Sequence, residues 1–105
     1  MLTVVETPEF SAWAHQVWSD ADREAFIDWI ASHPEAGEVI PGAGGLRKVR
    51  WRRAGMGKRG GARVIYDLRP ARHDILLIIV YAKAKFDNLR PEFLLQLKAR
   101  AHGKR

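Results

Sequence analysis

Apolar and polar residues in the first third of the chain follow a strand pattern and then a helical one. Residues 2–6 are short and rich in β-branched side chains, which favours a β-strand. Thr7 suits a helix N-cap, and apolar residues then recur every three to four positions, as on one face of a helix. A second helical pattern begins at Ser19 or Asp20 and ends before Pro34. The sequence therefore predicts a strand followed by two short helices.

The rest of the chain alternates between strand-forming runs and turn signals. Residues 35–45 contain four glycines and predict an irregular link. The runs at residues 46–52 and 63–68 flank a glycine-rich stretch, which predicts a β-hairpin. Residues 75–81 are uninterrupted apolar side chains, expected in a central strand that is buried on both faces. Residues 91–102 return to a helical pattern.

These elements predict an α+β fold, in one domain that covers residues 1–105. The expected order is strand, helix, helix, three strands and helix. It gives a mostly antiparallel four-stranded sheet with two N-terminal helices and one C-terminal helix. We expect the helices to cover one face of this sheet and to leave the other face to cationic side chains.

Charge is distributed very unevenly along the chain. The net charge of +6 conceals an acidic part, residues 1–38, in which eight carboxylates face one cation, Arg23, for a net charge of −7. The remaining residues carry seventeen cations and four carboxylates, a net charge of +13. A basic half supported by an acidic half is the distribution expected when one face binds nucleic acid or another polyanion.

The strongest concentration of positive charge lies in the predicted hairpin. Residues 44–66 contain no carboxylate. Their cations are Arg47, Lys48, Arg50, Arg52, Arg53, Lys58, Arg59 and Arg63. Such a run is often only a solvated face. Like charges on paired strands repel one another, however, so a ligand that neutralises them is the better explanation here.

Several kinds of chemistry lack the residues they require. The chain has no cysteine, its four histidines are scattered, and the basic hairpin offers no carboxylate for a metal. Lys58 is followed by Arg59 rather than Ser or Thr, which excludes a P-loop. No signal peptide or membrane-spanning run is evident, so we expect a soluble, cytoplasmic protein without a membrane partner.

Cleavage of RNA by its own 2′-hydroxyl is chemistry that cations alone can assist. The substrate supplies the nucleophile, and the protein needs only to align it, to neutralise the phosphoryl oxygens and to help protons move. Arginine binds phosphate through a planar fork, and lysine near other cations acquires a lowered pKa. Neither a metal nor a small-molecule cofactor is needed.

Three motifs in order carry a family resemblance. They read GGLRKVRW, GMGKRGGARVIY and IIVYAKAKFDNL. Together they resemble the signature of the RelE and HigB superfamily of type II toxin endoribonucleases, most closely over residues 41–89. The resemblance implies a ribosome-dependent mRNA interferase, a toxin that cuts mRNA in the ribosomal A site. It also implies a partner, an antitoxin encoded beside the toxin, and we expect this antitoxin to have a helix-turn-helix domain.

The resemblance also implies which residues act. Arg63 matches the strand arginine that stabilises the scissile phosphate, Lys83 matches a basic residue at the end of the last strand, and Lys58 belongs to the basic loop. These three are the expected catalytic residues. The residues expected to bind RNA are Lys48, Arg50, Arg53, Arg59, Tyr81 and Lys85.

Two positions depart from the family pattern. Ala84 stands where relatives commonly carry Asn, and Met56 stands where their loop often carries another lysine. The catalytic role of the residues missing at these two positions could be taken by Arg52, Arg53 and Lys85. The departures also leave open an alternative function, a non-catalytic RNA- or ribosome-binding module with a degenerate active site.

Overall fold

A computed structural model of the chain describes residues 1–51, 61–82 and 89–103. Its elements, in chain order, are β1 (Thr3–Glu6), α1 (Pro8–Val17), α2 (Asp20–Ser32), β2 (Glu38–Val39), β3 (Arg47–Trp51), β4 (Ala62–Arg69), the short 3₁₀ helix η1 (Pro70–Arg72), β5 (Asp74–Ala82) and α3 (Pro91–Gly103). Every helix and strand predicted from the sequence is present, with ends within one or two residues of the prediction.

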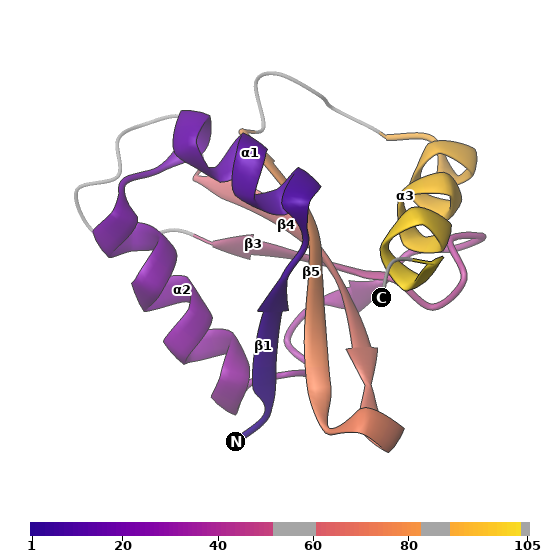
Figure 1. Cartoon of the computed structure of the whole chain (residues 1–105), viewed down its shortest axis with the longest axis horizontal. Helices are drawn as coiled ribbons and strands as arrows, with labels where there is room; N and C mark the ends of the chain where they lie inside the picture. Colours follow the sequence, from indigo (N-terminus) through magenta and orange to yellow (C-terminus); the bar gives the residue numbers. More distant parts are fainter. Residues whose placement is uncertain (52–60, 83–88, 104–105) are drawn as a thin grey trace.

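The strands form one five-stranded sheet in the order β1-β5-β4-β3-β2 (Figure 1). β1 pairs with β5 in parallel, and the other neighbours are antiparallel. The predicted count of four strands was therefore too low, because residues 38–39 add a short edge strand inside the stretch predicted to be an irregular link. The middle strand is β4 rather than residues 75–81, although β5 is buried on both faces as expected.

Thr7 fixes the passage from the sheet into the first helix. Its Oγ1 accepts a hydrogen bond from the backbone N–H of Phe10 at 3.1 Å, which caps α1. The same hydroxyl donates to the carbonyl of Leu77 at 2.8 Å, and the backbone N–H of Thr7 also donates to this carbonyl. One buried side chain thus both caps α1 and fixes it to β5.

Helices cover both faces of the sheet, which corrects the prediction that they would share one face. Phe10 and Ala14 of α1, with Phe26 and Ile30 of α2, pack against one set of strand residues, which includes Val64 and Val80. Leu94 and Leu97 of α3 belong to a second core on the other face of the sheet. The strand residues of this core alternate with those of the first and include Ile65, Ile79 and Tyr81. Figure 1 shows α3 apart from α1 and α2.

An irregularity in the pairing of β4 with β5 enlarges this second core. Ile65 pairs with Ile79, but the next residue, Tyr66, pairs with Leu77, so Ile78 is the extra residue of a β-bulge. Consecutive residues of a regular strand point to opposite faces. The bulge lets Ile78 and Ile79 both join the core beneath α3.

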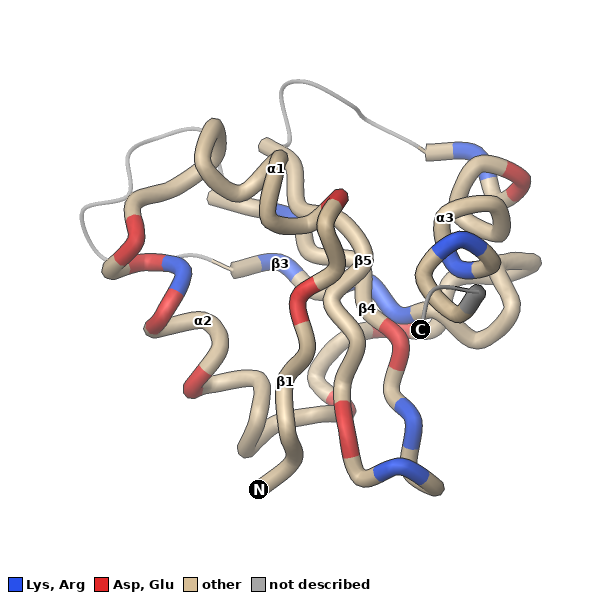
Figure 2. Tube along the Cα trace, in the orientation of Figure 1, with Lys and Arg blue, Asp and Glu red and all other residues tan. Residues whose placement is uncertain are grey.

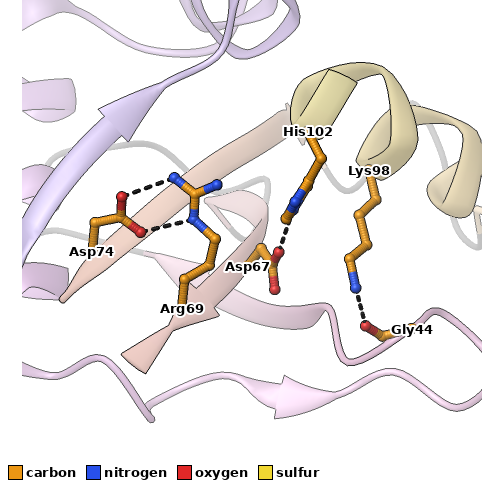
Figure 3. A network of polar contacts seen from close by, with 6 residues as sticks. All are labelled: Gly44, Asp67, Arg69, Asp74, Lys98 and His102. Atoms are coloured by element: carbon orange, nitrogen blue, oxygen red, sulfur yellow. Dashed lines mark hydrogen bonds and ion pairs between the residues drawn. The ribbon is translucent and has the colours of Figure 1, made fainter. Parts of the chain in front are cut away.

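Polar contacts fasten α3 and the nearby turns to the sheet (Figure 3). His102 near the end of α3 lies 2.7 Å from the buried carboxylate of Asp67 on β4. Lys98 donates a hydrogen bond to the backbone carbonyl of Gly44, in the link before β3. Arg69 and Asp74 form a two-pronged ion pair at 2.8 Å that joins the ends of β4 and β5.

Tyr66 holds the link that leads into β2. Its phenolic oxygen accepts a hydrogen bond from the N–H of Gly37 and donates one to the carbonyl of Pro34, each at 2.8 Å. Arg47 donates to the carbonyl of Gly37 at 2.8 Å. Gly37 approaches so closely that an added Cβ would lie 2.9 Å from both the carbonyl oxygen of Lys48 and the ring of Tyr66. The position therefore needs glycine.

Replacing Tyr66 by Phe should destabilise the protein. The substitution leaves the ring in place but removes both hydrogen bonds, and the buried Gly37 N–H loses its partner. We expect a loss of about 1–3 kcal/mol in the free energy of unfolding, measured by urea denaturation. A change below roughly 0.5 kcal/mol, the size typical of neutral surface substitutions, would mean that Tyr66 does not anchor the link.

Candidate polyanion-binding site

Two arginines and a tyrosine form a row across the middle of the sheet. Arg50 on β3 is directly opposite Arg63 on β4, and Arg63 is directly opposite Tyr81 on β5. Directly paired residues point to the same face of a sheet. Lys48 projects on this face two residues before Arg50, opposite Ile65. The pairing therefore gathers three of the cations expected from the sequence on the α3 side of the sheet.

Arg63 is the unusual member of the row because it is almost completely buried. The relative solvent exposure of this residue is 8%. Its Nη1 atom is buried and has no hydrogen-bond partner among the described residues. The other half-buried arginines of the described chain find anions or carbonyls: Arg23 pairs with Glu6, Arg69 with Asp74, and Arg47 with the carbonyl of Gly37.

Among the described residues no anion pairs with this buried guanidinium, which is unfavourable, and the Arg50 charge directly opposite adds repulsion. Arginine is always protonated in proteins, so Arg63 cannot escape this cost by losing its charge. The arrangement is explained if an anionic ligand completes it. Phosphate fits, because its oxygens accept two parallel hydrogen bonds from a guanidinium.

A cavity of about 450 Å³ lies at this row. Half of its lining residues are the cations Lys48, Arg50 and Arg63, and the others are Ala36, Glu38 and Val49. β3 and β4 supply the cations, while Ala36 and Glu38 come from the link that Tyr66 holds. The cavity is thus bounded by paired strands on one side and an anchored link on the other.

Glu38 was not anticipated as part of this site. It lies on β2, directly opposite Lys48, and its side chain is exposed. The sequence suggested an irregular link at this point, and two residues are too few to give a recognisable strand pattern. The sequence signal for this strand was limited to two residues, Glu38 and Val39, shortly before the turn at Pro41. A single carboxylate at the rim limits where a polyanion can lie.

Tyr81 occupies the opposite end of the row, and 2% of its area is exposed. It belongs to the second core beside Leu94 and Ile79, so it has a packing role. Burial raises the pKa of the Tyr81 phenol above its usual value, while the nearby charge of Arg63 acts in the opposite direction. The phenol is therefore neutral at physiological pH.

Five of the predicted site residues lie outside the described residues. They are Arg53, Lys58, Arg59, Lys83 and Lys85, and the departures at Met56 and Ala84 lie outside them too. The described residues beside these gaps end near one another, because Ala62 of β4 pairs with both Trp51 of β3 and Ala82 of β5. Trp51, Ala62 and Ala82 are next to Arg50, Arg63 and Tyr81 along their strands, so the gaps begin beside the cationic row.

The acidic residues are concentrated away from this site (Figure 2). Many of them lie along α2 and at the end of β1. α2 packs on the sheet face opposite α3, so its four carboxylates, half of those in the acidic part, are separated from the cationic row by the sheet. Among the described residues, no three His, Asp or Glu side chains gather closely enough to hold a metal ion. No helix of the described ranges is long and apolar enough to cross a membrane.

The sheet order, the helices on both faces and the cationic row define a small α+β domain built to present a buried arginine. No family model matches the chain. Among solved structures, its fold is similar to that of the E. coli toxin RelE. A double arginine-to-alanine variant of RelE in the free state matches with a TM-score of 0.56 and 15% identity, over 97% of this chain and 95% of that one.

The intact E. coli RelBE toxin-antitoxin complex matches with a TM-score of 0.55 and 16% identity. That match covers 78% of this chain and 96% of the other. The chain therefore has a RelE-like toxin fold, which confirms at the level of fold the resemblance found in the three sequence motifs.

Replacing Arg63 by Met should make the free protein more stable. Methionine fills similar space, removes a charge that has no anionic partner among the described residues, and removes the repulsion with Arg50. We expect the free energy of unfolding to rise by about 1 kcal/mol, as measured by urea denaturation.

Arg69→Met on the same strand is the matched control. It breaks the ion pair with Asp74 and should lower the free energy of unfolding by about 1–3 kcal/mol. If Arg63→Met destabilised the protein as much as Arg69→Met, Arg63 would be a structural residue that already has its partner.

Proposed function

We propose that the protein is the toxin of a type II toxin-antitoxin system, a ribosome-dependent endoribonuclease that cleaves mRNA without a metal. The observation that carries this proposal is the buried guanidinium of Arg63, which lines a cationic cavity and has an unpartnered Nη1 within the described chain. The RelE-like fold is consistent with it.

In the proposed reaction, the 2′-oxygen of the substrate attacks the adjacent phosphorus and the 5′-oxygen leaves. Arg63 neutralises the charge that builds up on the phosphoryl oxygens. Its position is fixed by backbone pairing with β3 and β5, so little ordering is needed when the transition state forms. This places the main electrostatic contribution on a rigid strand rather than a loop.

The remaining proposed roles are assigned to other basic residues. Lys83 helps a proton to leave the 2′-hydroxyl and to reach the 5′-oxygen, and Lys58 makes a smaller contribution to this step and a larger one to binding the RNA. Lys48 and Arg50, which line the cavity, hold neighbouring phosphates. Arg53, Arg59 and Lys85 extend this contact with the RNA backbone, and the buried Tyr81 supports Arg63 from the adjacent strand.

We further propose that the partners are mRNA on the ribosome and an antitoxin of the helix-turn-helix type, all in the cytoplasm. A surface with this charge binds polyanions broadly and needs a partner that masks it. One structural neighbour is the E. coli RelBE toxin-antitoxin complex, which supports an antitoxin as that partner.

A second candidate is a non-catalytic RNA- or ribosome-binding module. Ala84 and Met56, which replace the family's Asn and Lys, favour it. Such a module would use the same cations to bind RNA but would lack groups for proton transfer. Cleavage therefore separates the two candidates, whereas binding does not.

Expression of the chain alone should arrest growth and produce mRNA breaks within translated codons. Arg63→Ala should abolish the breaks and the arrest, because the transition state loses its fixed positive charge. Arg72→Ala removes the same charge from an exposed site on η1 and serves as the matched control, which should remain toxic. Growth curves and mapping of mRNA 5′ ends would measure both.

Breaks spread equally over untranslated RNA would point to a ribosome-independent nuclease. Arrest without any breaks would favour the non-catalytic module instead.

The basic residues should differ in which step they affect. Arg63→Ala and Lys83→Ala should each lower single-turnover cleavage by roughly 10²-fold or more, the scale of one lost transition-state contact. Lys58→Ala should affect chemistry less and binding more, with a flatter dependence of affinity on salt. Kinetics on ribosomes programmed with one mRNA would measure both steps. Loss of chemistry in Lys58→Ala with normal chemistry in Arg63→Ala would move the active centre to the loop.

A further inference from the structure

A second cavity, of about 380 Å³, lies on the same face of the sheet beside the cationic cavity. Its walls are mostly apolar and come from three places: the link before β3, the sheet, and the start of α3. Ile40, Leu89, Pro91 and Leu94 are among its lining residues. Its volume falls in the range of small-molecule sites, roughly 300–1,000 Å³.

The two cavities are adjacent. Lys48 lines both of them. Tyr81 lines the apolar cavity and is directly opposite Arg63, which lines the cationic one. The influence of the Arg63 charge on the pKa of Tyr81 agrees with their proximity. A ligand that bridges the cavities would thus place an anionic group at Arg63 and an uncharged group beside Tyr81.

We propose that the apolar cavity is a nucleobase subsite, which receives the base of the nucleotide whose phosphate is held at Arg63. This inference rests on the proposed function. A nucleotide joins an anionic phosphate to a flat, uncharged ring through one sugar, which matches the order of the two cavities. Apolar walls accept the faces of the ring. The ammonium of Lys48 at the junction has three N–H donors, so it donates to acceptor atoms on the edge of the ring as well as to a phosphate.

Such a subsite would let the protein recognise a base, which the cations alone cannot do. Contacts to phosphate fix the position of RNA but carry no sequence information. A base held between the link, the sheet and α3 would set the register of the RNA on the site. It would also favour an unpaired nucleotide, because a paired base must first be unpaired and unstacked to enter the cavity.

NMR on the wild-type chain tests the subsite directly. The ligand is a trinucleotide RNA with 2′-O-methyl groups, which block cleavage, and the protein carries labelled Ile and Leu methyl groups. We expect nuclear Overhauser contacts between protons of one base and the methyls of Ile40, Leu89 or Leu94. Replacing that one nucleotide by an abasic one should weaken binding about tenfold, whereas abasic changes elsewhere should have a smaller effect.

A filled cavity provides the matching change in the protein. Leu89→Trp should occupy the subsite, so that the intact and abasic trinucleotides bind equally weakly. Val5→Trp introduces the same side chain on β1 at the far edge of the sheet, where Val5 is exposed, and should keep the tenfold difference. The wild-type abasic series remains decisive even if Leu89→Trp does not fold.

The outcomes separate this inference from the function on which it rests. Equal affinity for intact and abasic RNA, with binding still dependent on Arg63 and on salt, would overturn the subsite and leave the function standing. Absence of binding to every RNA at low salt, or binding that Arg63→Ala does not change, would overturn the subsite and the assignment of Arg63 as its phosphate contact, whereas the proposed function is overturned by the absence of mRNA breaks on the ribosome.

Discussion

The candidate site is organised around one unfavourable placement, the permanent positive charge of Arg63 buried in the sheet. Arg63 is held there by pairing on both sides, with Arg50 opposite it on one strand and Tyr81 on the other. Its burial and the unpartnered Nη1 within the described residues distinguish it from Arg23 and Arg69, which have carboxylate partners. Stability elsewhere must offset this placement, which is the pattern expected where a fold is shaped for a ligand.

The elements around Arg63 supply that stability and shape its surroundings. The core beneath α1 and α2 holds the far face of the sheet, and the bulge at Ile78 widens the core beneath α3. Tyr66 anchors the link that carries Glu38 to the cavity, and the contact of His102 with Asp67 holds the end of α3. A rigid frame of this kind reduces the reorganisation that a charged transition state requires.

Much of the fold was predictable from the sequence because local signals were strong. The N-caps at Thr7 and Ser19 and the apolar run of β5 gave the helices and strands almost to the residue. Nonlocal features were not predictable. β2 is too short to leave a pattern, and which residues of β5 face α3 depends on strand parity after the bulge at Ile78.

The candidate site was predictable in part. Charge and motif pointed to Lys48, Arg50 and Arg63, and strand register brings them together. Sequence could not show that Arg63 is buried, since burial depends on how strands far apart in the sequence pair. It also gave no hint of Glu38 at the rim, or of an apolar cavity beside the cations.

The proposed function makes an RNA phosphate the partner of the Arg63 guanidinium. Electron cryomicroscopy of the protein on a ribosome, with an mRNA made uncleavable by a 2′-O-methyl group in the A-site codon, tests it most directly. We expect a phosphate oxygen within hydrogen-bond distance, about 3 Å, of the Arg63 guanidinium. An mRNA backbone bound elsewhere on the protein, with no phosphate oxygen near Arg63, would contradict it.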